Sequence, residues 1–348
     1  MICNNVRKLY LNDTMSCSTG GSTKKSSTRA SLHDPELNAL ANDIPKIILQ
    51  DRAPQTVKKY TNSFQQWKKW ATSKGLHALP ATGYEFALYL AFLLKSAKTM
   101  SPIHAAVYGT MWAHKKMGMA SPTEHPLVKQ MVEASKRIIG TAVTNRKRPL
   151  EVDHVKRLIG KFSTGDLSNL QMTCLITLGF SGFLRWDDLS RIRRQDVVFQ
   201  DDHMRIFLHK RKNDQYREGS WILIASTHSR TCPVELMQKF FLRGGHKPSD
   251  IVFRKISHTA AGIKLRQAPM TYSRAREMFS KQLKGIGLDP SQFGLHSLRS
   301  GGTTQAAAWG IPDRLIQRHG GWRSEVSMNM YIQETKNALL RVSQSLGL

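Results

Sequence analysis

Apolar residues in the first part of the chain recur at the spacing of α-helices. Between Ala53 and Gly75 they follow one another at steps of three or four positions and form one stripe: Val57, Tyr60, Phe64, Trp67 and Trp70. Three further segments carry a helical pattern: 84–94, 101–117 and 125–139. Together they predict a small helical domain over residues 45–140.

From residue 150 onward, helical and strand patterns are mixed. A helix is predicted at 151–162, and the apolar run 167–183 predicts a helix that is largely buried. Alternating apolar runs at 204–209 and 220–225, joined by a polar loop, predict a β-hairpin. The pattern then predicts four more elements: a helix at 233–243, a short strand at 251–254, a basic polar loop at 255–268 and a helix at 271–286. The predicted fold is therefore mainly α with a small β-sheet.

Two polar segments divide the chain. Residues 12–31 are rich in Ser, Thr, Asn and Gly and lack apolar spacing, so we predict a disordered basic arm over 1–44. Residues 141–149 are polar and basic and end in Pro149, which predicts a linker. A second domain then spans 150–348, and two domains suit a chain of 348 residues.

The net charge points to a polyanionic partner. The chain has 52 Lys and Arg against 25 Asp and Glu, a formal net charge of +27 that is spread along the sequence. Nucleic acid is the default partner for such a chain. An anionic membrane surface is the alternative, but no segment approaches 18 uninterrupted apolar residues, and we expect no membrane association.

Cysteine usage and the N-terminus favour an intracellular protein. The four cysteines do not have the spacing of metal ligands, which predicts reduced thiols: Cys3, Cys17, Cys174 and Cys232. Residues 1–10 carry charged and polar groups where a signal peptide needs an apolar run.

The last sixty residues contain the candidate chemistry. In the sequence His-Ser-Leu-Arg-Ser-Gly-Gly, His296 and Arg299 share one helix face and can bind one anion. A proline-started helix and a glycine turn are predicted over 311–322, followed by a short helical segment at 325–333 that contains Tyr331. Each part alone has an ordinary interpretation, because His-x-x-Arg occurs by chance and a tyrosine or tryptophan commonly serves packing.

The ordered set is more specific. His-Ser-Leu-Arg-Ser-Gly-Gly, then His-Gly-Gly-Trp, then a tyrosine nine residues after Trp322, resembles the active-site segment of the tyrosine recombinases, the phage-integrase family. The Cre-like variant has tryptophan where most members have a second histidine. The resemblance runs from about residue 50 to the C-terminus. It implies a helical SAM-like core-binding domain and a mixed α/β catalytic domain that form a C-shaped clamp on DNA.

The family pattern predicts an arginine motif upstream. Arg185 follows the buried helix, and a guanidinium there needs a partner, which is either Asp188 or an external anion. The segment resembles the family's first catalytic arginine motif, in which an acid three residues later supports the site. By itself, the pair of Arg185 and Asp188 favours a structural ion pair, and together with the downstream motif it favours the catalytic role.

The family also carries a lysine on the β-hairpin. The sequence Lys-Asn-Asp-Gln-Tyr-Arg-Glu-Gly, which begins at Lys212, resembles eukaryotic mobile-element recombinases of the crypton kind. We therefore assign this lysine to Lys212. Lys210 is the alternative, since the sequence does not set the hairpin register, and an exposed basic loop is the ordinary interpretation of either residue.

The resemblance implies a covalent reaction. Tyr331 would attack a DNA phosphodiester, forming a 3′-phosphotyrosine and freeing a 5′-hydroxyl, with Lys212 as the general acid for the leaving oxygen. A different DNA end could then attack the phosphotyrosine and complete strand exchange. The bond energy is conserved, so no ATP is required.

The same resemblance assigns the phosphate contacts. Arg185 and Arg299 would hold the non-bridging oxygens, and His296 and Trp322 would donate hydrogen bonds, with His296 also a candidate to assist deprotonation of the nucleophile. Asp188 would support the site from behind. We expect no cofactor and no metal, because the arginines supply the positive charge that a metal gives in other phosphoryl transfers.

Basic residues outside the catalytic set are candidate DNA contacts. They lie off the apolar stripe of the first helix, in the linker and on the helix at 271–286: Lys58, Lys59, Lys68, Lys69, Arg146, Lys147, Arg148 and Arg274. A solvated lysine face is the alternative for the first four. The cluster at 146–148 is too short to identify a nuclear signal, but we expect nuclear localisation from the eukaryotic character of the motifs and the basic charge.

The C-terminal segment 332–348 is amphipathic, with Leu339, Leu340 and Leu346 on its apolar side. In the family such a tail docks on a neighbouring protomer and builds a tetramer on double-stranded DNA. Packing of the tail on its own domain is the alternative, and the sequence does not separate the two.

Three functions remain open at this point. The first is a site-specific recombinase or integrase of a mobile element. The second is a type IB topoisomerase, which uses the same tyrosine chemistry on one strand, although the His-x-x-Arg spacing and the nine-residue step to Tyr331 favour a recombinase. The third is a domesticated DNA-binding protein that no longer cuts.

Overall fold

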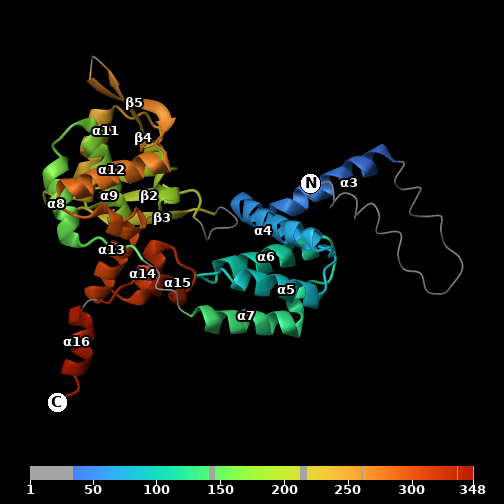
Figure 1. The fold of residues 1–348 in the computed structure, drawn as a ribbon. Helices are drawn as coiled ribbons and strands as arrows, with labels where there is room; N and C mark the ends of the chain where they lie inside the picture. The colour runs from blue at the N-terminus through green and yellow to red at the C-terminus, as the bar shows by residue number, and fades with distance from the viewer. Residues whose placement is uncertain (1–33, 141–145, 212–217, 260–261, 335, 348) are drawn as a thin grey trace, which may run out of the picture. The chain divides into compact units, whose positions relative to one another are not determined.

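A computed structural model describes residues 34–140, 146–211, 218–259, 262–334 and 336–347 (Figure 1). The chain divides into two compact units, Met1–Thr144 and Asn145–Leu348. The division falls inside the segment that the sequence predicts as the linker. Within the described ranges, no helix is long and apolar enough to cross a membrane.

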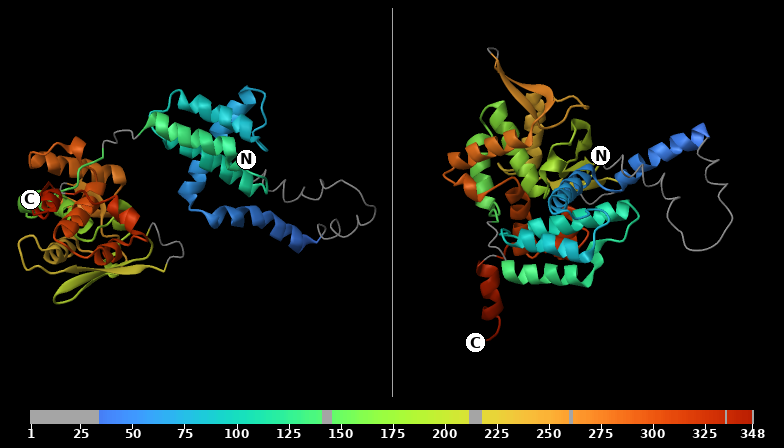
Figure 2. Two further views of the ribbon diagram at one scale, coloured as in Figure 1. Left: turned by 90° about the horizontal axis from the view of Figure 1, so that it is seen from below. Right: turned by 45° about the vertical axis from the view of Figure 1, so that its right-hand side comes forward.

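The four helices predicted between residues 53 and 140 are present. They are α4 (Pro54–Ser73), α5 (Gly83–Leu94), α6 (Ser101–Lys116) and α7 (Pro126–Ile139), and they lie together in one unit (Figures 1 and 2). Aromatic side chains are prominent in the core between them. Trp67 and Phe86 are fully buried, with ring centroids 5.3 Å apart at nearly a right angle. The aromatic stripe of the sequence is therefore the core of this unit.

Helix α3 (Pro35–Ile48) corrects the predicted disordered arm, which was expected to extend to residue 44. The carboxylate of Asp34 accepts hydrogen bonds from the backbone N–H groups of Glu36 and Leu37, and Pro35 occupies the first turn. Apolar residues follow at helical spacing: Leu37, Leu40, Ile44 and Ile47. This apolar stripe is short, and the longer polar stretch 12–31 precedes it, so the composition of residues 1–44 as a whole is polar.

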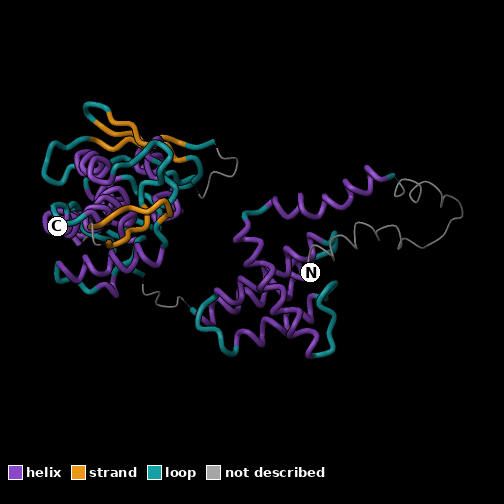
Figure 3. Tube along the Cα trace, turned by 90° about the horizontal axis from the view of Figure 1, so that it is seen from above, coloured by secondary structure: helices purple, strands orange, loops and turns teal. Residues whose placement is uncertain are grey.

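The second unit is built around α9 (Leu167–Ser181), which is buried on nearly all sides as predicted. The helices that pack against it include α8 (Val152–Phe162), α11 (Pro233–Gly244), α12 (Tyr272–Gly285) and α13 (His296–Ala308). A three-stranded antiparallel sheet lies beside them, in the order β1 (Val197–Phe199), β2 (His203–Leu208) and β3 (Ser220–Ala225). The predicted hairpin is β2–β3. All strands of the described residues lie in this unit (Figure 3).

A second hairpin corrects the prediction of a strand at 251–254 and a loop at 255–268. The strands are β4 (Arg254–Thr259) and β5 (Gly262–Pro269), and the hairpin projects from the body of the unit (Figures 1 and 2). Ile256 pairs with Leu265. Alternate positions on both strands are polar or charged, so the segment is too hydrophilic to be recognised from its apolar residues. Ile251 makes an isolated bridge to Arg193 instead of beginning a strand.

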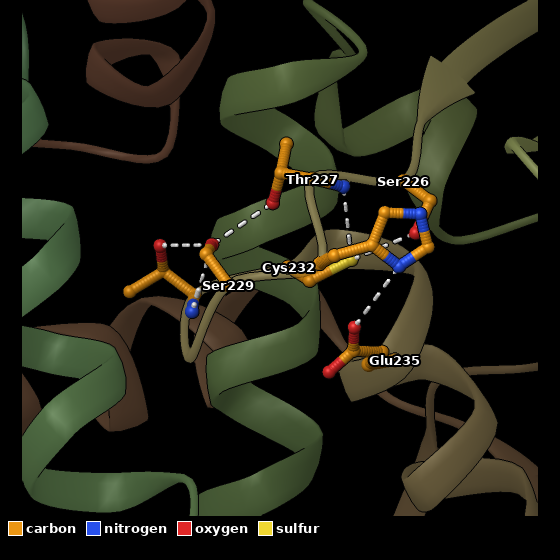
Figure 4. Close-up of polar contacts among 7 residues, drawn as sticks. Ser226, Thr227, Ser229, Cys232 and Glu235 are labelled. Atoms are coloured by element: carbon orange, nitrogen blue, oxygen red, sulfur yellow. Dashed lines mark hydrogen bonds and ion pairs between the residues drawn. The ribbon is translucent and has the colours of Figure 1, made fainter.

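The turn between β3 and α11 is closed by its own side chains (Figure 4). The thiol of Cys232 accepts from the backbone N–H of Thr227 at 3.4 Å, and the hydroxyls of Thr227 and Ser229 are 2.9 Å apart. Cys232 and Cys174 are buried, and neither is in a disulfide. Burial raises the pKa of the Cys174 thiol well above its usual range, so this side chain is a packing residue.

The remaining elements of the second unit are short, and most of them follow α13. They are α10 (Trp186–Leu189), α14 (Asp313–Gly320), α15 (Glu325–Asn329) and α16 (Lys336–Gln344), with short 3-10 turns at Arg194–Asp196 and Pro290–Gln292. Helix α15 is shorter than the predicted segment 325–333. Tyr331 therefore lies in the turn after the helix, where its backbone N–H bonds to Met328 O at 2.8 Å.

Candidate active site

Helix α13 carries the His-x-x-Arg motif and packs unusually closely on its neighbours. A Cβ atom at Gly301 would lie 2.1 Å from the carbonyl oxygen of Leu150, and one at Gly302 would lie 2.1 Å from that of Phe180. Only glycine allows these approaches. His296 is exposed at the start of the helix, and Arg299, one turn later, is fully buried.

Arg299 is held by backbone carbonyls and aromatic rings. Its guanidinium donates to Phe183 O and, at 3.0 Å, to Gly320 O. Its Cζ atom lies 3.8 Å from the ring centroid of Trp322 and 4.9 Å from that of Tyr331, within cation–π range. The predicted partners Arg299, Trp322 and Tyr331 are thus brought together.

Electrostatics at this position disfavour the positive charge. Burial, with the nearby charges of Arg185 and Arg211, lowers the pKa of Arg299 to about 9, although Tyr331 and Asp188 act in the opposite direction. Within the described ranges, Arg299 has no ion pair with a carboxylate. Its Nε atom is buried and lacks a hydrogen-bond acceptor. An anion bound here would neutralise the charge of Arg299 and accept a hydrogen bond from its Nε atom.

Arg185 sits at the start of α10, two positions after a strained residue. Phe183 has a φ of +49°, a left-handed conformation that is uncommon outside glycine, and its carbonyl faces Arg299. Asp188 accepts from the backbone N–H of Arg185 at 3.0 Å. Nη1 of Arg185 and Oδ1 of Asp188 are buried without a hydrogen-bond partner. Asp188 therefore contacts the backbone of Arg185 by a hydrogen bond, and one donor of the Arg185 guanidinium, Nη1, has no acceptor among the described residues.

Trp322 and Tyr331 lie against each other beside Arg299. Their ring centroids are 5.3 Å apart, Trp322 is 5 % exposed, and its Nε1 donor is buried without an acceptor. The hydroxyl of Thr304 on α13 donates to Tyr331 O at 3.3 Å and accepts from Gln333 N. The candidate nucleophile is thereby tied to the helix that carries Arg299.

Arg211 is a residue that the sequence did not predict. It is 5 % exposed, and its Nη2 donates to His319 O at 3.2 Å. Burial lowers its pKa, Asp188 opposes this effect, and Arg185 adds to it. Every second side chain of β2 is buried, and the last of these is Leu208. If this alternation continued beyond the strand, the side chain of Arg211 would be exposed. It is buried because the chain leaves the strand there, and no sequence signal marks that change.

The hairpin lysine was predicted at Lys212, which lies outside the described residues. The alternative, Lys210, is partly exposed and lines a small cavity with Asp188 and His209. His209 in turn lies 2.8 Å from a carboxylate oxygen of Asp196. The choice between the two lysines stays a prediction.

The predicted DNA contacts remain predictions as well. On α4, Lys58, Lys59 and Lys69 are exposed and Lys68 is partly exposed. Two basic residues of the predicted linker contact the second unit: Lys147 donates to Ser291 O, and Arg148 donates to Gln292 at 3.1 Å. Arg146, beside them, is exposed. Arg274 is paired with Glu277 at 2.8 Å.

Comparison with known proteins identifies the family. The model of the phage integrase family matches residues 148–338, more than half of the chain. The chain belongs to the phage integrase family. It is therefore an enzyme of the tyrosine-recombinase class, and the family expected from the motif order is confirmed.

A relative and two solved structures agree with this assignment. The integrase/recombinase xerD homolog of Selenomonas ruminantium is 27% identical over 288 residues, which cover 82% of this chain and 83% of the relative. The XerH site-specific recombinase in a post-cleavage complex with its difH substrate matches with a TM-score of 0.62 at 12% identity, over 98% of this chain and 94% of that chain. The Tn1549 transposon integrase in complex with circular intermediate DNA matches with a TM-score of 0.51 at 13% identity, over 98% of each chain. The predicted fold class, mainly helical with small antiparallel sheets, is confirmed.

Proposed function

We propose that this chain is a site-specific DNA recombinase or integrase of a mobile element. It would cleave and rejoin double-stranded DNA through a covalent bond between Tyr331 and a 3′ phosphate. The observation that carries the proposal is the environment of Arg299, a buried guanidinium held by carbonyls beside Tyr331, with an unused donor and no carboxylate partner among the described residues. Such a centre suits a phosphate that arrives with the substrate.

In the proposed cleavage step, the Tyr331 oxygen forms a bond to phosphorus and the bond from phosphorus to the 5′ oxygen breaks. The phenolic proton leaves to a base, and the freed 5′ oxygen gains a proton from Lys212. Arg185 and Arg299 stabilise the negative charge that builds on the non-bridging oxygens, and a fixed donor of this kind is worth roughly 10²–10³ in rate. Rejoining reverses the step with a new 5′-hydroxyl.

The arginines make metal and ATP unnecessary in this scheme. Two guanidiniums supply the positive charge for the transition state, and the phosphotyrosine conserves the energy of the broken bond. The prediction is therefore that cleavage persists in the presence of a chelator.

Double-stranded DNA as the partner is supported by the net charge of +27 and by structural neighbours solved with DNA. On this proposal four protomers assemble on the duplex. The C-terminal tail presents exposed apolar residues that suit docking on a neighbour: Leu339, Leu340, Val342 and Leu346. Nuclear localisation stays a prediction.

Covalent trapping tests the proposal. The protein is incubated with nicked DNA from the ends that flank its own gene, quenched in detergent and examined for a protein–DNA adduct, with and without chelator. We expect an adduct in the wild type and in Tyr108→Phe, an exposed tyrosine of the helical unit, and none in Tyr331→Phe.

Two results would move the proposal to the alternatives. Relaxation of supercoiled DNA through the same adduct, without joining between sites, would indicate a type IB topoisomerase. Absence of any adduct, with a Tyr331→Phe chain that behaves as the wild type in cells, would indicate a DNA-binding protein that does not cut.

A further inference from the structure

The charges around Asp188 do not balance. Arg185, Arg211 and Arg299 act on one another electrostatically, and Asp188 is the carboxylate that acts on both Arg211 and Arg299. The pKa of Arg211 and that of Arg299 are both lowered, first by burial and then by neighbouring arginines. Three buried or partly buried cations thus share one described carboxylate, which leaves an excess of positive charge.

The unused hydrogen-bonding atoms of the cluster are mostly donors. Four donors are buried without an acceptor among the described residues: Arg185 Nη1, Arg211 Nε, Arg299 Nε and Trp322 Nε1. The unused acceptor is Oδ1 of Asp188. Buried donors without partners cost free energy, so the site is suited to a ligand that is rich in acceptors and negatively charged.

Arg211 reaches this site from the end of β2 and contacts the turn that leads into Trp322. It donates to His319 O at 3.2 Å, and Arg299 donates to the next carbonyl, Gly320 O, at 3.0 Å. Gly321 has a φ of +66°, and a Cβ atom there would lie 2.1 Å from Arg211 Nη1. Arg211 therefore lies against Gly321, where a larger residue would collide with its guanidinium.

We propose that Arg211 is a third arginine of the phosphate site. It holds the turn 319–321 in place, and its charge acts together with those of Arg185 and Arg299 on the scissile phosphate. This inference rests on the proposed function, and it assigns Arg211 a role that the motifs of the sequence do not imply.

The test compares two substrates that differ in charge. One carries the natural phosphodiester at the cleavage site, and the other a methylphosphonate, which has one negative charge fewer. With the phosphodiester, we expect Arg211→Gln to form the Tyr331 adduct about 10²-fold more slowly than the wild type. With the methylphosphonate the difference should shrink to about tenfold or less, because less charge needs stabilisation.

Two further variants separate charge from support of the turn. Arg211→Lys keeps the charge and should cleave the phosphodiester faster than Arg211→Gln. Arg205→Gln removes an exposed arginine of β2, the strand that precedes Arg211, and should cleave as the wild type does. Arg211→Gln loses the hydrogen bond to His319 O but no ion pair with a carboxylate within the described part of the chain, so it should fold with only a small change of melting temperature.

Several results would overturn the inference. Equal slowing of both substrates, or equal rates for Arg211→Lys and Arg211→Gln, would leave Arg211 with no electrostatic role. Wild-type cleavage by Arg211→Gln would leave it with no role at all, and failure of that variant to fold would make it a structural residue.

A measurement on the protein without DNA separates this inference from the proposed function. At constant ionic strength, inorganic phosphate should raise the melting temperature of the wild type more than chloride does, and this shift should be smaller in Arg211→Gln. An equal shift in both proteins would contradict the role of Arg211. If the wild type forms no adduct but shows the phosphate effect, the proposed function fails while the anion site stands.

Discussion

Two buried arginines of the second unit, Arg254 and Arg299, are both hidden from solvent but have different partners. Arg254 is 4 % exposed and forms an ion pair with Asp250 at 3.1 Å, and it also donates to Gly244 O. Arg299 is 0 % exposed, yet its partners among the described residues are backbone carbonyls and aromatic rings, with no ion pair to a carboxylate. The first guanidinium is neutralised by a carboxylate of the protein, whereas the second has no such partner among the described residues, which suits the proposed phosphate contact.

The residues around Arg254 and Arg299 also differ in their charges and hydrogen bonds. Gln171 on α9 bonds the backbone N–H and the carbonyl of Arg254, at 2.8 and 3.1 Å, and so secures the start of the β4–β5 hairpin. Burial by itself would raise the pKa of Asp250, but the hydrogen bond from Lys247 and the charge of Arg254 outweigh it and the pKa is lowered. Around Arg299, by contrast, neighbouring arginines add to the cost of burial. Arg254 thus has an ion-pair partner, and Arg299, the proposed phosphate contact, has none among the described residues.

Removing Arg254 should have the largest effect on stability. Arg254→Met leaves the buried Asp250 without its partner, and breaking a buried pair in this way costs about 3–5 kcal/mol. The free energy of unfolding from urea titration measures the loss, with Arg266→Met, an exposed arginine of the same hairpin, as the control. Adduct formation per folded molecule should be unchanged, and a variant as stable as the wild type would show that the pair does not support the fold.

Removing Arg299 should have the opposite profile. Arg299→Gln should slow adduct formation by roughly 10²–10³, because it takes away a preorganised donor to the phosphate. Its free energy of unfolding should not decrease as that of Arg254→Met does, since no carboxylate of the described residues loses an ion pair. Unchanged cleavage together with a large loss of stability would make Arg299 a structural residue like Arg254.

Substitution of Gly321 should disturb the turn between the arginines and Trp322. Gly321→Ala places a side chain in a left-handed conformation, which costs about 1–2 kcal/mol, and also displaces Arg211. Gly310→Ala is a matched control, because Gly310 has a φ of +74° and open space around it. Both variants should lose stability, but only Gly321→Ala should lose cleavage. Equal cleavage rates for the two variants would contradict a role for the turn.

The helical unit offers a small effect that depends on pH. His114 is buried, its Nδ1 donates to Thr110 O at 2.8 Å, and its Nε2 accepts from Ala81 N at 3.1 Å. Burial lowers its pKa below the ordinary value of 6.5, so protons bind the unfolded chain more readily than the folded one. This contribution to stability is complete above pH 6.5 and decreases as the pH falls below it.

Urea unfolding at pH 7.5 and pH 5.5 tests the effect of His114. The wild type should lose stability at the lower pH, and His114→Gln should lose less. His246 and His319, which are partly buried, also have lowered pKa values, so part of the pH dependence should remain in the variant. An identical pH dependence in both proteins would show that His114 does not contribute.

The success of the sequence predictions depended on how local each signal was. The aromatic stripe of α4 and the apolar run of α9 were predicted because burial along a helix repeats every three or four residues. The β4–β5 hairpin was predicted as a loop, since its strands alternate polar residues with few apolar ones. Helix α3 was missed beside a long polar stretch, although its apolar spacing and the cap at Asp34 were present in the sequence.

The sequence by itself determined the charge, the helical stripes and the order of His296, Arg299, Trp322 and Tyr331, because composition and spacing are properties of the chain. Only the tertiary structure decided which arginines have carboxylate partners and that Arg211 joins the site. Arg211 meets His319 across 108 positions, and Arg299 meets Phe183 across 116. Contacts over such separations depend on how helices and strands pack, and no local pattern of residue types encodes them.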